Sequence, residues 1–506
     1  KCWQSKFNTR PKCVQIDGCV DHSIIANNFA QHFAKVCNTD DMLHALRLKD
    51  EFQNKKLNYS GAHINVEDEF NVELISNIIQ KLKRGKAAGL DNITAEHLQY
   101  CHPVLCCILT KLFNLMFKFS YVPSSFSLSY IVPIPKTKDY YSKHLTCNDF
   151  RGITISCLMS KVFEMCIFER FSKFLLSSDN QFGFKKGIGC SHAIYTLRNI
   201  VDYYVAGSST VNICSLDLSK AFDKVDHSAL FIKLMNRQIP VELLDLLVFW
   251  LDNCFSCVKW NSHFSQFIKL NFGVRQGSVL SPHLFAVYID DITASLPVDQ
   301  RLCIIVYADD ILLLSPSLCF LQKLLYQCEL ELKWLGMTIN ATKSCCLRIG
   351  KRHDVTCSNI ATSNGIKLPW VNELRFLGTY ILKANSFKCS IHECKKSFFR
   401  SANSIFGKVG RIASENVVIH LIYSKCLPVL LYGLECFMLS KSQLNSLDFS
   451  FNRFLFKLFK TADINVVNFY RDMFNVKLPS ELLALRRKRF TLKYNEYRGI
   501  NRVNLA

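Results

Sequence analysis

The stretch Leu302-Cys-Ile-Ile-Val-Tyr-Ala-Asp-Asp-Ile-Leu-Leu-Leu-Ser315 places a pair of aspartates between apolar runs that are rich in β-branched residues. This pattern predicts a β-hairpin with Asp309 and Asp310 at its turn. Adjacent carboxylates repel each other, and a bound divalent cation is the usual way to make such a pair favourable. Aspartate is also a good turn residue, so this stretch alone leaves both a metal site and ordinary turn chemistry open.

The composition indicates a large folded protein with a polyanionic partner. A chain of 506 residues is too long for one ordinary core, so we expect about two to four structural units. A hydrophobic content of 49% excludes a disordered chain. The excess of 62 Lys and Arg over 41 Asp and Glu gives a charge of +21. This charge favours nucleic acid or an anionic membrane surface as the partner.

Targeting signals and cysteine usage suggest a protein that is not secreted. No apolar run is long enough to span a membrane, and no signal peptide is visible, so we expect a cytoplasmic or nuclear protein without a membrane partner. The 24 cysteines lack the regular spacing of a disulfide framework and are expected to be mostly reduced and buried. Cys389, His392 and Cys394 form one local cluster with ligand character, but no second spaced pair accompanies it. Because the chain starts at Lys1, we expect it to be part of a longer polypeptide.

Hydrophobic periodicity outlines the elements along the chain. Residues 1–58 are expected to be a polar N-terminal extension with one helix and no chemistry. Apolar spacing predicts helices over 24–36, 72–82, 108–119, 158–175, 243–251, 284–292 and 321–335. Strands are predicted over 129–135, 149–155 and 211–216. Beyond residue 378 the pattern becomes long, cationic and amphipathic, and we expect helices to the end of the chain.

Charged side chains at strand ends supply candidate chemistry. Lys136 and Arg151 lie at the inner ends of the predicted strands 129–135 and 149–155. These strands would form a hairpin whose two cationic side chains could contact a bound anion. Asp217 directly follows the strand 211–216, which puts a carboxylate at the strand's C-terminal edge. An aspartate in this position is also a frequent helix N-cap.

The order of the chemistry-bearing segments carries more information than any one of them. In chain order they are Asp217 after a strand, Arg275-Gln-Gly-Ser278, Tyr307-Ala-Asp-Asp310, Gly336-x-x-Ile-Asn-x-x-Lys343 and Phe376-Leu-Gly378. Together these segments resemble motifs A to E of reverse transcriptases, over about residues 71 to 380. Further segments make the chain most similar to the polymerases of non-LTR, LINE-type retrotransposons of the jockey-like kind: Lys86-Ala-Ala-Gly-Leu-Asp91, Gln181-Phe-Gly-Phe184, Asp217-Leu-Ser-Lys-Ala-Phe-Asp223 and Tyr432-Gly-Leu-Glu435.

The resemblance implies an α+β fold of the right-hand polymerase type, with fingers, an antiparallel-sheet palm and a helical thumb. It suggests an N-terminal extension or linker at 1–58, fingers and palm at 59–384, and a thumb with a C-terminal region at 385–506. The implied activity is RNA-directed DNA polymerisation, in which a dNTP is transferred to a primer 3′-hydroxyl. The implied partners are an RNA template, a DNA primer, their RNA–DNA hybrid and dNTP substrates.

The resemblance also implies a metal site. Nucleotidyl transfer uses a pair of Mg²⁺ ions, or Mn²⁺, and both ions prefer carboxylate oxygen. Asp217 and Asp309 match the family's metal ligands, with Asp310 beside them, and the carbonyl of Leu218 is expected to help on the nucleotide-side metal. Lys343 matches a lysine that is a candidate general acid for the leaving pyrophosphate, although a solvated lysine is the alternative.

Other matched residues would bind the nucleotide and the primer. Lys136 and Arg151 match the residues that grip the triphosphate, and Phe222, five residues after Asp217, matches the steric gate against a 2′-hydroxyl. The remaining matches are Gln276, Gly277 and Tyr307 in the nucleotide pocket, where glycine lets the template base approach closely, and the primer grip Phe376, Leu377 and Gly378. The basic residues 486–489 resemble part of a thumb that contacts duplex phosphates. Gly152 departs from the family, which usually has proline after the arginine.

Two other functions are compatible with parts of this pattern. An RNA-templated RNA polymerase is disfavoured because Ala308 stands where those enzymes usually carry glycine, and because Phe222 should exclude ribose. A catalytically silent nucleic-acid-binding protein is disfavoured because all three acids and both triphosphate cations are present. Salt-dependent RNA binding without polymerisation would favour the silent protein.

Overall fold

The chain passes several times between two structural units, so each unit contains segments that are far apart in the sequence. The computed structural model describes residues 15–39, 41–64, 69–136, 144–294, 302–410 and 412–500. The first unit comprises 1–177, 218–292 and 330–338, and the second comprises 178–217, 293–329 and 339–506.

A five-stranded sheet forms the centre of the first unit. Its strands are β1 (Leu128–Pro135), β2 (Phe150–Ser156), β4 (Phe255–Trp260), β5 (His263–Phe264) and β6 (Ile268–Lys269). Strand β1 pairs with β2 in antiparallel fashion and with β4 in parallel fashion. The predicted pairing of 129–135 with 149–155 is therefore confirmed.

The N-terminal segment packs onto this sheet. Residues 1–14 lie outside the described residues, but the predicted helix 24–36 is confirmed as α2 (His22–Val36), capped by the Asp21 carboxylate. Its apolar face joins strand residues in one core, and the Phe33 ring occupies the space where Gly152 of β2 has no side chain. A proline side chain at residue 152 would collide with this ring, so Phe33 supplies the packing that the glycine lacks. Helix α3 (Met42–Leu57) follows, and its Phe52 packs on Phe231.

Helices surround the sheet of the first unit. They are α4 (Val72–Gln80), α5 (Ala95–Gln99), α6 (Val104–Lys118), α7 (Ser124–Ser127), α8 (Leu158–Phe171), α10 (His227–Asn236), α11 (Val241–Asp252), α12 (Ser281–Tyr288) and α13 (Asp291–Ala294). The apolar periodicity predicted α4, α6, α8, α11 and α12, with ends that differ by a few residues, but it missed α10 and also α3, so the expectation of a single helix in residues 1–58 is wrong. Helix α12 begins earlier than predicted because Pro282 is compatible with the first turn of a helix.

A four-stranded antiparallel sheet forms the centre of the second unit, in the order β7-β8-β3-β9. Its strands are β3 (Val211–Leu216), β7 (Cys303–Tyr307), β8 (Asp310–Ser315) and β9 (Cys345–Ile349). Strands β7 and β8 form the predicted hairpin, in which Tyr307 pairs with Asp310 across a turn made by Ala308 and Asp309. Ala308 has φ +54°, and its N–H donates to the Gln181 side chain at 3.0 Å, which holds this turn in place.

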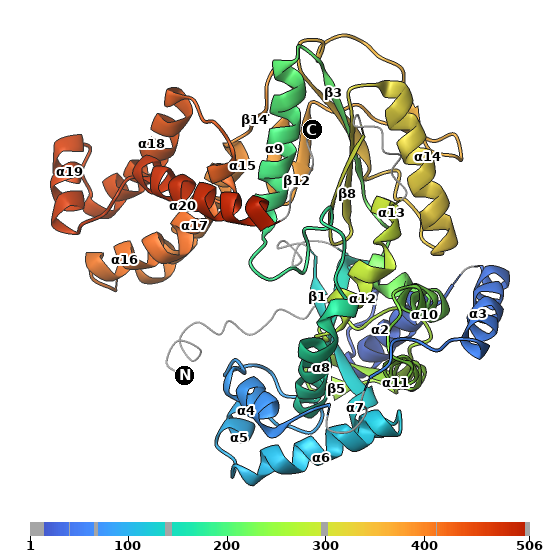
Figure 1. Cartoon of the computed structure of the whole chain (residues 1–506). Coiled ribbons are helices and arrows are strands. Elements are labelled where there is room, and N and C mark those ends of the chain that lie inside the picture. Colours follow the sequence, from blue (N-terminus) through green and yellow to red (C-terminus); the bar gives the residue numbers. More distant parts are fainter. Residues whose placement is uncertain are drawn as a thin grey trace. The chain divides into compact units, whose positions relative to one another are not determined.

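Helices cover both faces of this second sheet. Side chains alternate between the faces of a strand, so Ile213 of β3 packs in the core that contains Leu197 of α9 (Cys190–Ala206). Its neighbour Cys214 lies on the opposite face and interacts with Cys328 of α14 (Leu318–Trp334). Figure 1 shows α9 and α14 on the two sides of β3 and β8.

The C-terminal part of the second unit begins with strands and then becomes helical. A three-stranded sheet contains β12 (Glu373–Phe376), β13 (Thr379–Leu382) and β14 (Lys388–Cys389), and β10 (Ile360–Ala361) pairs with β11 (Lys367–Leu368). The expectation of helices throughout the region after 378 is wrong for β13 and β14, because Leu377 and Gly378 both have positive φ and close a hairpin there. The later helices are α15 (His392–Val409), α16 (Glu415–Leu421), α17 (Leu427–Leu430), α18 (Lys441–Phe459), α19 (Ile464–Met473) and α20 (Pro479–Ile500).

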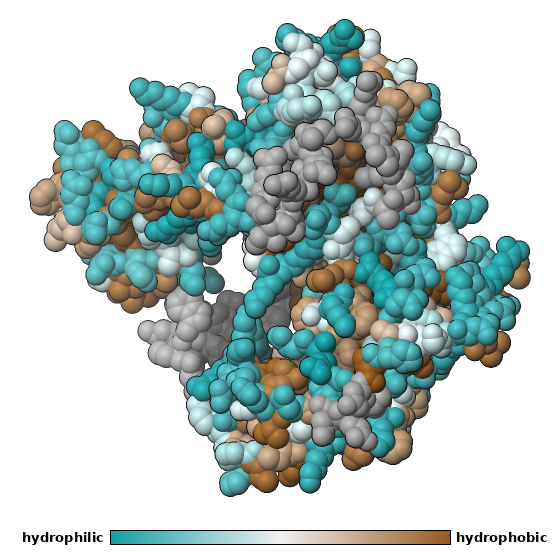
Figure 2. All heavy atoms as spheres, viewed as in Figure 1, coloured by the Kyte–Doolittle hydropathy of each residue, from teal (hydrophilic) through white to brown (hydrophobic). Residues whose placement is uncertain are grey.

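The surface is mixed in polarity. Figure 2 shows polar residues over much of the visible face, with apolar residues gathered around α16 and α19. Exposed Phe469 and Met473 contribute to the apolar surface of α19. Within the described ranges, no helix combines the length and the apolar character that a membrane span requires.

The packing of α2 predicts a local stability effect. Phe33→Ala should cost about 3 kcal/mol because truncating a buried aromatic side chain leaves a cavity. Ile24→Ala on the same helix, where the side chain is 50% exposed, should cost less than ~1 kcal/mol. Hydrogen exchange of amides in α2 and β2 measures both effects locally. Equal losses of protection in the two variants would contradict the role of Phe33 in this core.

Candidate active site

Antiparallel pairing brings the separate acidic segments of the second unit together. Leu216, the last residue of β3, pairs with Ile311 of β8. The register therefore sets the next residue, Asp217, opposite Asp310, while Asp309 lies in the adjoining turn. Three aspartates from segments about ninety residues apart in the sequence thus meet at one edge of the sheet.

The charges of this cluster oppose one another. Desolvation and repulsion by Asp309 and Asp217 raise the pKa of Asp310 to about 6, and Arg375 opposes this shift. Much of the surface of Asp310 remains open to solvent, so a cation could reach its carboxylate. Burial is the larger cause of this raised pKa and repulsion by the neighbouring carboxylates the smaller, and both disfavour the charged form of Asp310.

The segment after α14 holds the first aspartate. Asn340 donates its N–H to the carbonyl of Asp217 at 2.8 Å, and the N–H of Asp217 donates to Ser344 Oγ at 3.1 Å. Lys343 Nζ lies 3.6 Å from Asp217 Oδ2, but its side chain is 68% exposed, so water screens this ion pair. The sequence indicated Lys343 and missed the anchoring role of Ser344, which nothing in the local pattern signals.

The cluster fits a divalent metal by its chemistry more than by its present geometry. Carboxylate oxygens are the donors that Mg²⁺ and Mn²⁺ prefer, and a cation would relieve the repulsion around Asp310. Among the described residues, however, no group of three or more His, Cys, Asp and Glu side chains is arranged to hold a metal ion. Leu218, whose carbonyl was expected to assist, has a buried side chain.

In the first unit, the β1–β2 hairpin brings two cations close together. Ile134 pairs with Arg151, and the N–H of Lys136 donates to the carbonyl of Asp149 at 2.8 Å. This register sets Lys136 and Arg151 at diagonal positions on the same face of the hairpin. Both residues are exposed, so this end of the hairpin can receive an anion.

An aromatic stack holds the ring of Phe222, the residue expected to be the steric gate. The Phe222 ring stacks on Phe285 of α12 with ring centroids 4.3 Å apart and planes 18° apart. The carbonyl of Phe222 also accepts a hydrogen bond from the N–H of Val274 at 2.9 Å. The ring is only partly buried, and its position depends on α12 and on the loop that precedes this helix.

That loop, residues 273–280, which we call the pocket loop, packs tightly against β2. The N–H of Thr154 donates to the carbonyl of Gln276 at 2.8 Å. Gly277 has φ +139°, and a Cβ there would lie 2.2 Å from the carbonyl oxygen of Thr154. The chain's own backbone therefore requires glycine at this position, independently of any template base.

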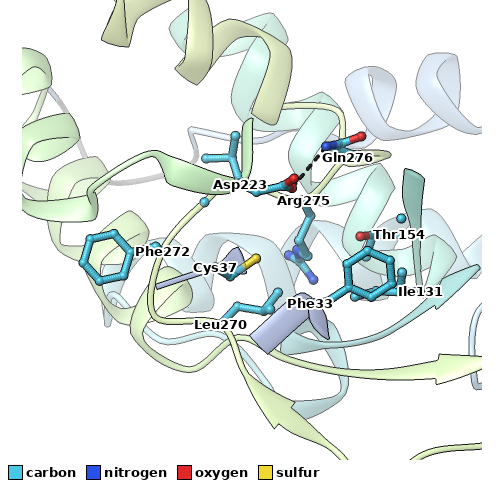
Figure 3. Close-up of a pocket in the computed structure, with 12 residues that line it drawn as sticks. Phe33, Cys37, Ile131, Thr154, Asp223, Leu270, Phe272, Arg275 and Gln276 are labelled. Atoms are coloured by element: carbon cyan, nitrogen blue, oxygen red, sulfur yellow. Dashed lines mark hydrogen bonds between the residues drawn. The ribbon is translucent and has the colours of Figure 1, made fainter. Parts of the chain in front are cut away.

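A small cavity lies beside the pocket loop. It has room for about 30 Å³, and its lining includes Phe33, Cys37, Thr154, Asp223, Arg275 and Gln276. Figure 3 shows the Gln276 side chain pointing to Asp223, and Nε2 of Gln276 lies 3.1 Å from Oδ1 of Asp223. Burial raises the pKa of Asp223, whereas the hydrogen bond from Gln276 lowers it. The sequence signal for this residue is the second aspartate of the segment Asp217-Leu-Ser-Lys-Ala-Phe-Asp223.

The expected primer grip is a tight turn between β12 and β13. Phe376 is buried in the core of the second unit. Gly378 has φ +81°, and a Cβ there would lie 3.0 Å from the Tyr432 ring. A cavity of about 470 Å³ adjoins this turn, with Arg375, Gly378, Tyr380 and Tyr432 in its lining. Desolvation raises the pKa of Tyr307, with a further contribution from a hydrogen bond to Cys190.

The cluster of Cys389, His392 and Cys394 near β14 lacks the ionised thiols that a zinc site requires. Burial raises the pKa of the Cys389 thiol to about 12 and that of Cys394 to about 11, which opposes the thiolate form that binds zinc. Cys394 donates its S–H to the carbonyl of Ile391, and His392 lies beside Glu393. All cysteines in the described ranges are free thiols.

Comparison with known proteins shows which proteins this chain resembles. Residues 134–381 match the family described as "Reverse transcriptase (RNA-dependent DNA polymerase)". The RNA-directed DNA polymerase from mobile element jockey of Drosophila funebris is 25% identical over 414 residues, which cover 75% of this chain and 43% of the relative. The probable RNA-directed DNA polymerase from transposon BS of Drosophila melanogaster is 24% identical over 409 residues, which cover 76% of this chain and 44% of the relative. The chain thus spans less than half the length of these curated relatives.

Solved structures add only a distant likeness. Apo telomerase from Candida tropicalis is similar with a TM-score of 0.37 and 13% identity, over 70% of this chain and 66% of that chain. This likeness is too weak to support an argument. The matched residues 134–381 contain all the ordered motifs, so the family match and the retrotransposon relatives agree with the resemblance of those motifs. Residues 134–381 thus match a reverse transcriptase domain, and the chain is similar to RNA-directed DNA polymerases of mobile elements.

Proposed function

We propose that this chain is an RNA-directed DNA polymerase that extends a DNA primer on an RNA template. The observation that carries the proposal is the register of β3 and β8, which sets Asp217 opposite Asp310 and beside Asp309 in a reverse transcriptase domain. The charge of +21 supports nucleic-acid partners. An RNA template, a DNA primer and dNTPs would be the substrates.

In this proposal the carboxylates hold the metals. Asp217 and Asp309 would be the main ligands, with Asp310 and the carbonyl of Leu218 beside them. A pair of Mg²⁺ ions, when bound, would lower the pKa of the primer hydroxyl and neutralise the triphosphate. Lys343, which lies close to Asp217, would give a proton to the departing pyrophosphate.

The nucleotide-binding residues have separate tasks. Arg151 would form a forked contact with the triphosphate, and Lys136 would act as a point charge. Phe222 would lie beneath the sugar and exclude a 2′-hydroxyl. Gln276, Gly277 and Tyr307 would line the base and sugar pocket.

The domain roles follow from the same proposal. The sheet β7-β8-β3-β9 would be the palm, and the β1–β2 hairpin with its surrounding helices would belong to the fingers. Residues 376–378 would hold the primer end. The helices after residue 385, including the basic residues 486–489 of α20, would be a thumb that binds the duplex backbone.

The acidic cluster predicts a loss of activity when one carboxylate is removed. Asp309→Asn should reduce primer extension on an RNA template with Mg²⁺ and dNTPs by about 10³-fold, because several kcal/mol of metal-dependent stabilisation of the transition state are lost. Asp354→Asn is the matched control, since that side chain is 78% exposed. Undiminished extension by the Asp309 variant, or no extension by the wild type, would refute the proposed function.

The aromatic stack predicts a change in sugar selectivity. Phe222→Val should raise ribonucleotide incorporation relative to deoxyribonucleotide incorporation by about tenfold or more, because removing a steric exclusion is worth 1–3 kcal/mol or so. The ratio of kcat/KM values for the two sugars measures this effect apart from overall activity. Exposed Phe267 provides the control substitution Phe267→Val. Unchanged selectivity in the Phe222 variant would remove the gate assignment.

A further inference from the structure

We infer that Glu164 is a positioning residue that holds the pocket loop and, through α12, the steric gate, and thereby controls dNTP affinity and sugar selectivity. This inference rests on the proposed function and assigns a role to a residue outside the reverse transcriptase motifs discussed above. Glu164 lies on α8, is 1% exposed and touches neither the acidic cluster nor the cations of the β1–β2 hairpin through any hydrogen bond of the described structure.

One carboxylate oxygen of Glu164 accepts hydrogen bonds from several groups at the end of the pocket loop. Oε2 accepts hydrogen bonds from Ser278 Oγ at 2.5 Å and from the N–H of Leu280 at 3.0 Å, and it also accepts from the N–H of Val279. These groups immediately precede α12, whose N-cap residue Leu280 has no side-chain acceptor to offer. Glu164 therefore supplies the acceptor and the negative charge that a helix N-terminus favours.

The opposite side of the pocket loop is held by the nucleotide pocket itself. Thr154 of β2 bonds to the carbonyl of Gln276, and Asp223 accepts from the Gln276 side chain. The Gln276–Gly277 peptide thus lies between β2 and the residues that Glu164 holds. A loop held from two sides has little freedom to shift, so loss of the Glu164 contacts should displace Gln276.

Helix α12 transmits the same constraint to the gate. Phe285 lies one turn beyond the α12 N-terminus and is fully buried, and its ring stacks on Phe222. Helix α12 has only eight residues, so a change at its first turn alters the position of the Phe285 ring. The ring of Phe222, the proposed gate, stacks on Phe285 and should therefore move with it.

The burial of Glu164 indicates more than a packing role. Its second oxygen, Oε1, is buried and has no hydrogen-bond partner within the described part of the chain. A cavity of about 20 Å³ is lined by Glu164, Arg275 and Ser278 among other residues and has room for about one water molecule. Keeping a carboxylate here is costly compared with an apolar side chain, so a specific requirement for its acceptor strength is the simplest reason for its presence.

The test compares Glu164→Gln with Glu69→Gln. The amide keeps the shape of the side chain but loses the charge and replaces one acceptor with a donor. Glu69 is another buried carboxylate of the first unit, paired with Arg170 at 2.5 Å and without contact to the pocket loop in any hydrogen bond described. Primer extension on an RNA template gives KM for the dNTP, KM for the primer–template, kcat and the ratio of deoxyribonucleotide to ribonucleotide use.

Glu164→Gln should raise the dNTP KM about tenfold and lower the sugar selectivity severalfold, because hydrogen bonds to charged groups are the strong ones. The KM for the primer–template should not change, and Glu69→Gln should leave the selectivity at the wild-type value. A uniform loss of kcat with unchanged selectivity, or the same effects in Glu69→Gln, would overturn the inference.

Two further variants test the inference if Glu164→Gln does not fold. Ser278→Ala removes one donor and should produce a smaller change in the same direction, and Phe285→Leu should relax sugar selectivity from the other end of α12. Unfolding of all three variants, or wild-type selectivity in the folded ones, would overturn the role of Glu164. An inactive wild type would overturn the proposed function and this inference together, whereas an active wild type with unaltered variants would overturn only the inference.

Discussion

The antiparallel register between β3 and β8 is the constraint on which the acidic cluster depends. Because Leu216 pairs with Ile311, the residues that follow and precede them, Asp217 and Asp310, lie opposite each other at one edge of the sheet. A shift by one residue would turn each side chain to the other face and separate the carboxylates. The buried residues of β3 and β8 prevent such a shift, since it would expose apolar side chains that now form the core.

This arrangement has an electrostatic cost that the surrounding structure offsets. Desolvation and the neighbouring charges disfavour ionised Asp310, and its pKa rises accordingly. Hydrogen bonds from Asn340 and to Ser344 hold the backbone of Asp217 in place, and Arg375 reduces the repulsion. A bound cation would relieve the repulsion around Asp310, because its positive charge would offset the neighbouring carboxylates.

In the first unit, close packing around two glycines holds the pocket loop and β2 in place. Gly277 touches the carbonyl of Thr154, and Gly152 lies under the Phe33 ring, so neither glycine leaves empty space. The pocket loop is therefore determined by its neighbours β2 and α8 more than by its own flexibility. The N-terminal helix α2 contributes to the same packing, although its sequence contains no recognisable chemistry.

The sequence by itself determined the types of many elements and the identity of the chemical groups, because hydrophobic periodicity and motif order are local properties, although it missed the helices α3, α9 and α10. It indicated the Asp309 hairpin, the strand before Asp217, the cations of the β1–β2 hairpin and the aromatic residue Phe222. Only the tertiary structure decided that Ser344 anchors Asp217, that Phe33 fills the space at Gly152, and that Glu164 holds the pocket loop. These contacts join residues that are more than one hundred positions apart, and their geometry depends on strand register and helix packing, which no local pattern encodes.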